Sequence, residues 1–207
     1  MLTIYLVRHG ETQWNTENRL QGWKNSPLTE KGIRNAKLLG KRLSNIEFRA
    51  VYSSPNERTI QTSKYICSGR NIPIITDENL KEISYGEWEG KTKEEIEKNF
   101  KKEYFDYWNA PHLYDHRPHK GEGINDLKKR VENVLNKILA ENPSGNVLIV
   151  SHAATIKALL LYTMNIPIEK MWDPPFIYGT SLTVFHWDGK RFIFETVGDT
   201  SHFEEDV

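Results

Sequence analysis

Three short apolar segments end abruptly in polar residues, and this pattern restricts the fold more than any other feature of the chain. The segments are 2–7, 48–52 and 146–150, and the last two run directly into helical patterns. Strands that alternate with helices indicate a mostly parallel sheet that is covered on both faces. We therefore expect an α/β fold, arranged as a three-layer α/β/α sandwich.

Helical patterns fill the intervals between these strands. Apolar residues at positions 33, 36, 39 and 43 predict an amphipathic helix from about 29 to 44, and a second is predicted by Leu127, Val131, Val134 and Ile138. The segment 153–164 is apolar on nearly every side, so we expect it to be the most buried helix.

Another helix start is marked by residues that follow the second strand. Ser54 and Glu57 have the spacing of a capping box, and Pro55 suits the first helical position. This interpretation places Arg58 in the first turn of the helix.

The C-terminal part departs from the alternation of strands and helices. Segments 181–187 and 190–197 flank Asp188-Gly189, which is the signal of a two-residue type I′ hairpin. We expect this hairpin to close the sheet as an antiparallel edge.

The segment from about 91 to 121 differs in character from its surroundings. Thr92 and Glu95 have capping-box spacing, and four aromatic residues fall on one helical face, which we expect to be used for packing: Phe100, Tyr104, Tyr107 and Trp108. We expect residues 1–207 to form a single domain in which this segment is an inserted helical cap over the site.

The charge balance and the cysteine content restrict the partners and the location. Lysine plus arginine number 28 and aspartate plus glutamate number 28, so the formal net charge is zero. A chain without a net basic field gives no sign of a nucleic-acid or membrane partner. No apolar run approaches the roughly 18 residues of a membrane-spanning helix, and the single cysteine, Cys67, fits a reducing cytoplasm. We expect a soluble cytoplasmic protein, whose oligomeric state the sequence leaves open.

Four basic side chains follow strand ends or lie in the first helical turn after one. They are Arg8, His9, Arg58 and His152. Because ligands of parallel sheets bind beyond the carboxyl ends of the strands, we expect these groups to converge, together with the helix N-terminus near Ala153. Paired guanidinium groups match the oxygens of a phosphoryl group, so the sequence predicts a pocket for a tetrahedral dianion.

The chemistry of such a pocket points to the imidazole of His9. The sequence has no Walker loop, no acidic cluster for Mg²⁺ and no reactive cysteine, so a neutral imidazole nitrogen is the plausible attacking atom, giving a phosphohistidine. A carboxylic acid must protonate the leaving alkoxide. Residue chemistry alone does not choose among Glu78, Glu82, Glu87 and Glu89.

Four stretches of the sequence resemble, in order and spacing, the histidine phosphatase superfamily in its phosphoglycerate-mutase-like branch. They are LVRHGETQWN at 6–15, SSPNERTIQT at 53–62, LKEISYGEWEG at 80–90 and VSHAATIKAL at 150–159. The resemblance covers nearly the whole chain. It implies His9 as the phosphorylated nucleophile and Glu82 as the proton donor, with a phosphate cage formed by Arg8, Arg58 and His152. It also implies phosphate contacts from Asn15, Gln21 and the backbone amide of Ala153, and it implies no metal and no other cofactor.

The same chemistry serves phosphatases and mutases, and several positions favour a phosphatase. Phosphoglycerate mutases of the family carry an arginine and a histidine directly after the proton-donating glutamate, where this chain has Ile83 and Ser84. The insertion lacks an Arg-Arg pair, and the family's GES motif reads Gly121-Glu122-Gly123. We expect a metal-independent phosphatase that acts on a small-molecule phosphate ester through a partly apolar acceptor pocket. A cofactor-dependent phosphoglycerate mutase and a non-catalytic phospho-ligand binding protein are the alternatives.

Three histidines in the insertion have spacings that a zinc site could use. They are His112, His116 and His119. Pro111 and Pro118 bracket them, and no cysteine accompanies them, so we interpret the run as an irregular, solvated loop.

Overall fold

A single sheet forms the centre of the computed structural model, which describes residues 1–203. Six strands in that part of the chain pair in the order β3-β2-β4-β1-β5-β6. Their bounds are β1 Leu2–Arg8, β2 Phe48–Ser53, β3 Ile74–Thr76, β4 Gly145–Ser151, β5 Leu182–Trp187 and β6 Phe192–Asp199. Strands β1 to β4 are parallel to one another, whereas β5 runs antiparallel to both of its neighbours. The predicted mostly parallel sheet with an antiparallel edge is confirmed.

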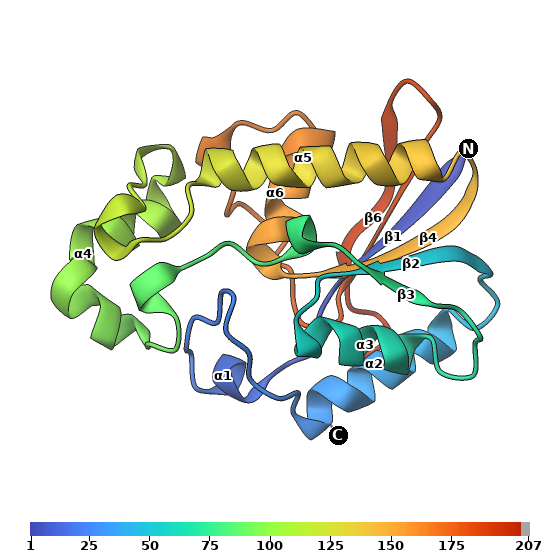
Figure 1. Cartoon of the computed structure of the whole chain (residues 1–207), viewed down its shortest axis with the longest axis horizontal. Coiled ribbons are helices and arrows are strands. Elements are labelled where there is room, and N and C mark those ends of the chain that lie inside the picture. The colour runs from blue at the N-terminus through green and yellow to red at the C-terminus, as the bar shows by residue number, and fades with distance from the viewer. Residues whose placement is uncertain (204–207) are drawn as a thin grey trace.

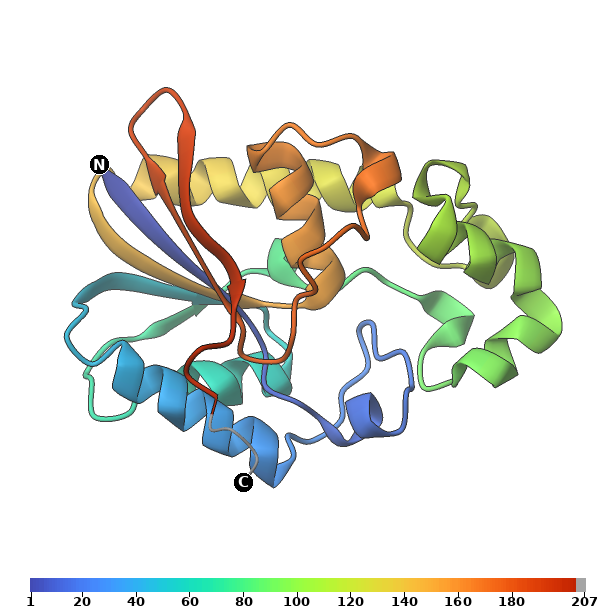
Figure 2. The same ribbon diagram turned by 180° about the vertical axis from the view of Figure 1, so that it is seen from behind.

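Helices cover both faces of this sheet, which confirms the three-layer arrangement (Figure 1 and Figure 2). Helices α2 (Glu30–Arg42) and α3 (Glu57–Ile66) lie on one face, and α5 (Ile124–Glu141) and α6 (Ala153–Thr163) lie on the other. Successive strand residues point to opposite faces, so each face receives its own apolar cluster. Helix α6 is buried without interruption from residue 154 to 161, as its sequence predicts.

The strand ends are aligned where the basic residues follow them. Strands β2, β4 and β1 are neighbours, Arg8 pairs with Ser151, and Ser53 pairs with Val150. Because these three carboxyl ends lie at one edge of the sheet, the residues that come next in each segment are brought together. Helix α1 (Gln13–Thr16) belongs to the loop that leaves β1 at this edge.

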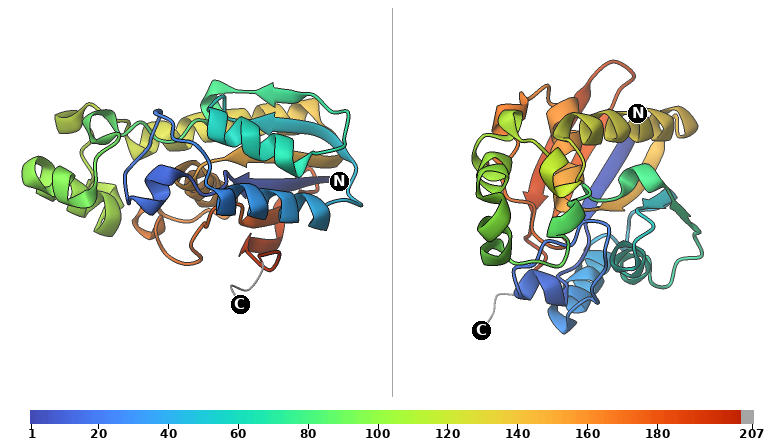
Figure 3. Two further views of the ribbon diagram at one scale, coloured as in Figure 1. Left: turned by 90° about the horizontal axis from the view of Figure 1, so that it is seen from below. Right: turned by 60° about the vertical axis from the view of Figure 1, so that its left-hand side comes forward.

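We call residues 91–121 the cap. Its main element is α4 (Lys93–Asn109), which lies beyond the carboxyl ends of the strands and is seen from two further directions in Figure 3. The Thr92–Glu95 capping box is present as predicted, but the helix kinks at Phe100, where φ is −135° and ψ is 40°.

The interior of the cap is aromatic. Phe100, Tyr104 and Tyr107 surround the buried indole of Trp88, which confirms their packing role. His119 stacks on the same indole with ring centroids 3.7 Å apart and is fully buried. The expectation that the histidine loop is solvated is therefore wrong for His119, because the sequence gives no sign that an aromatic face would cover it.

The C-terminal end of the cap packs closely against the segment that precedes the cap. Gly86 has a φ of +56°, and a Cβ atom there would lie 2.1 Å from the carbonyl oxygen of His119. Only glycine allows this approach, so Gly86 permits the two segments to lie side by side.

Two local predictions are wrong. Helix α3 begins at Glu57 with Asn56 as its N-cap, because the hydroxyl of Ser54 donates a hydrogen bond to Asn56 Oδ1 (2.9 Å) instead of capping the helix. The hairpin between β5 and β6 has a four-residue loop, since Trp187 pairs with Phe192. In that loop Asp188 Oδ1 accepts hydrogen bonds from the two amides that precede Phe192 (2.8 and 2.9 Å), and these bonds stabilise the longer turn.

No group of three or more histidine, cysteine, aspartate and glutamate side chains in residues 1–203 is arranged to hold a metal ion. Within the same range, every helix is too short or too polar to cross a membrane.

Candidate active site

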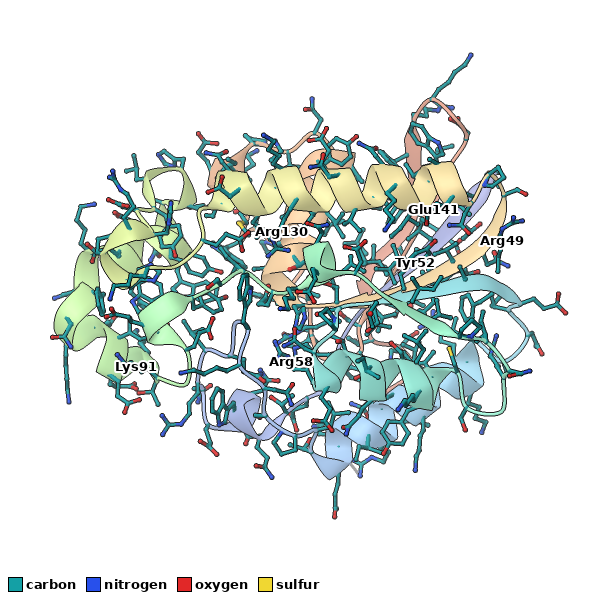
Figure 4. All side chains as sticks on the ribbon, in the orientation of Figure 1. Arg49, Tyr52, Arg58, Lys91, Arg130 and Glu141 are labelled. Atoms are coloured by element: carbon teal, nitrogen blue, oxygen red, sulfur yellow. The ribbon has the colours of Figure 1, made fainter. Side chains whose placement is uncertain are left out.

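A cavity of about 410 Å³ lies at the carboxyl ends of the central strands. Arg8, His9, Arg58, Glu82 and Ala153 line it, so side chains from β1, α3, α6 and the segment after β3 meet in one place. Figure 4 labels Arg58, which extends from the first turn of α3 toward the centre of the molecule. The predicted convergence of the basic groups is confirmed.

His9 is held as a neutral imidazole. Its backbone amide continues the β1–β4 pairing by donating to Ser151 O (2.9 Å), which fixes the position of the residue. The ring nitrogen Nδ1 is 2.7 Å from Gly10 O, so Nδ1 carries the proton and Nε2 keeps its lone pair. Burial, and then the charges of Arg58 and Arg8, lower the pKa of His9 well below its usual range. The free lone pair leaves Nε2 chemically able to act as a nucleophile at neutral pH.

The guanidinium of Arg58 is almost completely buried, with 1% exposure. Its terminal nitrogens donate to the carbonyl oxygens of Lys24 (2.6 Å) and Gly22 (2.7 Å) and to Nδ1 of His152 (3.0 Å). Burial lowers the pKa of Arg58 to about 10, so it remains charged at neutral pH. These contacts fix the plane of the guanidinium before any ligand binds.

Two donors of the arginines have no protein partner. Arg8 donates through Nη1 to Ile177 O (2.7 Å), but Nε of Arg8 and Nε of Arg58 are buried and unpaired within residues 1–203. A buried donor without a partner costs about 1–3 kcal/mol, and an anion in the cavity would remove that cost. The unpaired donors therefore point to an anionic ligand.

His152 follows β4 and lies against His9, with ring centroids 5.2 Å apart. Its Nδ1 accepts from Arg58, and its Nε2 donates to Ser54 Oγ (2.8 Å). Burial, with the charge of Arg58 as the next cause, lowers the pKa of His152 well below its usual range. Because both ring nitrogens are engaged, the structure shows His152 orienting Arg58. The contact with phosphate that the resemblance implies stays a prediction and requires one of these bonds to exchange.

Glu82 lies on the irregular segment that leads to the cap, and its carboxylate rests on the N-terminus of α6. Oε1 accepts from the amides of Ile83 (3.0 Å) and Thr155 (3.1 Å). The hydroxyl of Thr155 lies 3.2 Å from Oε1 but makes its shorter bond to the carbonyl oxygen of Lys81 (2.7 Å). Oε2 accepts from the amide of Ala154 at 3.3 Å. Oε1 is thus the more fully bonded oxygen, and Oε2 is the one better able to carry a proton.

The other three acids of this region are committed elsewhere. Glu78 pairs with Lys81 (2.7 Å) and Glu87 with Lys120 (2.7 Å). Glu89 accepts from backbone amides, including those of residues 23 and 85. Among the four candidates, Glu82 is the one on the cavity wall.

Asn15, Gln21 and Ala153 all line the cavity, and their predicted phosphate contacts stay predictions. Asn15 Oδ1 accepts from the amide and the hydroxyl of Thr12 (both 3.0 Å), which leaves its amide N–H groups for a ligand. Gln21 Nε2 donates to Thr12 Oγ1 (2.8 Å), and Gln21 Oε1 is buried without a partner in the described part of the chain. The NH2 group of Gln21 has a second N–H that the bond to Thr12 does not use.

A further part of the cavity lining is aromatic, and most of it was not predicted from the sequence. Trp108 comes from the cap, and Trp172, Phe176 and Tyr178 come from the loop between α6 and β5. Lys157 of α6 holds this loop by donating to the carbonyl oxygens of residues 173 and 175 (2.6 and 2.8 Å). The one sign of this lining in the sequence is the closeness of Trp172, Phe176 and Tyr178 within a single loop.

Comparison with known proteins gives one family and several full-length relatives. Residues 4–200 match the model of the histidine phosphatase superfamily (branch 1). Phosphoserine phosphatase 1 from Hydrogenobacter thermophilus is 28% identical over 208 residues, which cover 99% of this chain and 96% of that protein. The probable phosphoglycerate mutase GpmB from Cronobacter sakazakii is 31% identical over 211 residues, with coverage of 99% and 96%.

Solved structures show the same architecture. YhfR from Bacillus stearothermophilus superposes with a TM-score of 0.95 at 43% identity and covers 99% of this chain and 100% of its own. The α-ribazole phosphatase from Shigella flexneri superposes with a TM-score of 0.85 at 26% identity, with coverage of 96% of each chain. The matched span of the family model includes all the residues that line the cavity.

Proposed function

Because this chain belongs to the histidine phosphatase superfamily (branch 1), we propose that it hydrolyses small-molecule phosphate esters through a phosphohistidine on His9. One observation carries the proposal. His9 lines a cavity together with two arginines, and each of these arginines has a buried Nε donor without a partner in residues 1–203. A nucleophile placed beside paired cations is the arrangement that phosphoryl transfer requires.

In the first step His9 Nε2 attacks phosphorus. An N–P bond forms, the ester P–O bond breaks with its electron pair on the leaving oxygen, and that oxygen takes the proton of Glu82 Oε2. In the second step the Glu82 carboxylate removes a proton from water, the water oxygen bonds to phosphorus, and the N–P bond breaks. Both groups return to their starting states, so the cycle balances.

Arg8 and Arg58 supply the positive charge for the transferred group. Their forks match phosphate oxygens, and the contacts of Arg58 with backbone carbonyls and His152 keep it in place during the reaction. We include in the proposal that no metal ion takes part, since these two cations perform the charge stabilisation that a divalent ion performs in other phosphoryl-transfer enzymes.

The surroundings of Glu82 favour a phosphatase over a mutase. Ile83 is fully buried, and the backbone of Ser84 is bound to Glu122, so neither position offers the cationic contact that mutases of the family use. Arg19, a further cation on the cavity wall, is paired with Glu17 (2.8 Å) and Glu95 (3.0 Å). Among the other cations of the cavity lining, Arg19 is thus paired with acids and Lys157 is engaged by two backbone carbonyls, so neither is placed to bind a remote carboxylate.

For the alcohol part of the ester, we propose only a chemical class. Relatives are named for phosphoserine, α-ribazole phosphate and phosphoglycerate, so the shared feature is a small phosphate monoester. The aromatic wall supports an alcohol with an apolar portion. The buried, free thiol of Cys67 is in keeping with a cytoplasmic location.

Trapping the intermediate tests the proposal. Wild-type protein mixed with a phosphate-labelled ester and quenched in alkali should carry label on one histidine, and His9→Ala should carry none. Label on another residue, or none on the wild type during turnover, contradicts the proposal, and tight ester binding without turnover identifies the binding protein instead. Adding 3-phosphoglycerate with and without 2,3-bisphosphoglycerate separates the activities: a phosphatase releases phosphate, whereas a mutase forms 2-phosphoglycerate.

A further inference from the structure

The segment that carries Glu82 has little structure of its own. We call residues 79–84 the strap. It enters from a 3₁₀ turn at 78–80 and crosses to the cap without a helix or strand from 81 to 85. A general acid must be placed within a fraction of an ångström of its target, so the strap needs support from outside.

That support comes from Arg130 of α5, whose guanidinium donates through all five N–H groups. Nη1 donates to Asn79 O and Lys81 O (both 2.8 Å), and Nη2 donates to Glu82 O (2.9 Å). The two remaining N–H groups, on Nε and Nη2, form a bidentate pair with the carboxylate of Glu122 (2.6 and 2.8 Å). Figure 4 labels Arg130 below α5, on the side that faces the strap.

Glu122 fixes the far end of the strap. Its Oε2 accepts from the amide of Ser84 (3.1 Å), and its own amide donates to Ser84 O (2.8 Å). The ion pair therefore holds three carbonyls before or at Glu82 and both backbone groups of Ser84 after it. The side chains of Arg130 and Glu122 are 16% and 14% exposed, so water competes weakly for these bonds.

We infer that Arg130 and Glu122 are positioning residues that place the Glu82 carboxyl for proton transfer. The inference rests on the proposed function. A lysine cannot replace Arg130, because an ammonium has three donors and cannot span the carbonyls and the carboxylate together. The charge would stay in place, but the geometry of the strap would relax.

The dependence of rate on the leaving group distinguishes this role from a structural one. Phenol is a poor leaving group and needs the proton of Glu82, whereas 2,4-dinitrophenolate leaves without one. The quantity to compare is kcat/KM for phenyl phosphate and for 2,4-dinitrophenyl phosphate. It reports on the steps up to and including the first irreversible one, which contains the departure of the leaving group. For Arg130→Lys we expect a loss of about 10- to 100-fold with the phenyl ester, within the range that proton transfer contributes, and less than about 3-fold with the dinitrophenyl ester.

Two further variants complete the experiment. Glu82→Gln provides the benchmark, because it should lose more kcat/KM with the phenyl ester than Arg130→Lys does and again little with the dinitrophenyl ester. Lys129→Gln changes an exposed neighbour on α5 and should leave kcat/KM for both esters unchanged. Should Arg130→Lys fail to fold, Glu122→Gln retains the side-chain shape and should show the contrast by itself.

The outcomes separate the two proposals. Equal losses on both esters in Arg130→Lys, beside a normal contrast in Glu82→Gln, overturn the positioning role and leave the phosphatase intact. Absence of the contrast in Glu82→Gln overturns both the positioning role and the assignment of Glu82 as the acid. A wild type that hydrolyses neither ester overturns the proposed function itself.

Discussion

The two ends of the cavity are built in different ways. At one end, which we call the phosphate end, basic side chains follow the aligned strands. A continuous set of hydrogen bonds runs from Arg58 through His152 and Ser54 to Asn56 and fixes their orientations. At the leaving-group end, aromatic side chains come from the cap and from an irregular loop, and Phe176 and Tyr178 are 63% and 57% exposed. The cavity is polar and closely hydrogen-bonded where we propose that phosphate binds, and it is aromatic and partly exposed where we propose that the alcohol binds.

This difference teaches that the two ends serve separate purposes. Under the proposed function, catalysis depends on geometry that the sheet edge determines, whereas the choice of alcohol depends on contact area. Variants at the phosphate end should therefore change rates by orders of magnitude, and variants at the other end should change affinity by small factors.

The largest effect is expected for His9→Ala. Loss of the nucleophile should reduce kcat for p-nitrophenyl phosphate by about 10⁴-fold or more, as removal of a catalytic nucleophile does elsewhere. The assay is steady-state release of p-nitrophenol, with thermal unfolding as the control for folding. Retention of most of the activity would mean that the phosphate end has another nucleophile, which would end the comparison.

A smaller effect is expected for His152→Ala, and it should appear in two measurements. Arg58 and Ser54 each lose a buried partner, so kcat/KM should fall by about 10²-fold. The free energy of unfolding should fall by about 1–3 kcal/mol for each partner left unsatisfied. Chemical denaturation and kinetics check the two effects. His152→Asn, which retains an acceptor, should recover part of both, and a loss of activity with unchanged stability would contradict the orienting role.

Stability should decrease as the pH falls from 7 to 5. His9, His152 and His119 are neutral in the folded protein because burial, first among the causes, lowers the pKa of each. In the unfolded chain the same histidines take up protons near pH 6.5. The free energy of unfolding is therefore greatest above that pH and declines below it. For each histidine the total decline is about 1.4 kcal/mol for every unit by which folding lowers its pKa. Melting temperatures at each pH measure the decline.

Histidine variants assign that pH dependence to one region or the other. His119→Gln should flatten the decline if the cap contributes, His152→Asn if the phosphate end does, and the exposed His112→Gln serves as the control. A decline that neither His119→Gln nor His152→Asn alters would show that these two histidines do not cause it.

The smallest effect is expected for Trp108→Ala at the leaving-group end. Loss of one aromatic contact should raise KM for phenyl phosphate by about 3- to 10-fold. The inhibition constant of inorganic phosphate should stay unchanged, because phosphate alone does not reach the aromatic wall. Phe105→Ala, an exposed residue of the same helix, is the matched control. An equal change in phosphate inhibition would show that the two ends are not separate.

The sequence was most informative where local pattern and topology agree. Apolar strands that end in Arg8 and His152 predict a shared sheet edge, and the structure has both residues there. Capping chemistry was less reliable. Ser54 has the spacing of a cap, but the fold uses its hydroxyl between His152 and Asn56, and a spacing rule contains no information on such distant partners.

Features that depend on long-range contacts could not be predicted from the residues. The choice of Glu82 among four acids follows from its place on the α6 N-terminus, 72 positions before Ala154 in the chain. The aromatic loop and the contacts of Arg130 also join segments that are far apart in sequence. Only the resemblance to a family identified Glu82 beforehand, and it gave no reason for the choice.

The close approach at Gly86 has a consequence for redesign. Because the chain returns from the cap beside the point where it departs, the cap can be exchanged without altering the register of any strand. A graft would have to keep Glu89, whose carboxylate accepts from the amides of residues 23 and 24, since the carbonyl oxygen of Lys24 accepts from Arg58. Within that limit, we expect a foreign cap to change which alcohol is accepted.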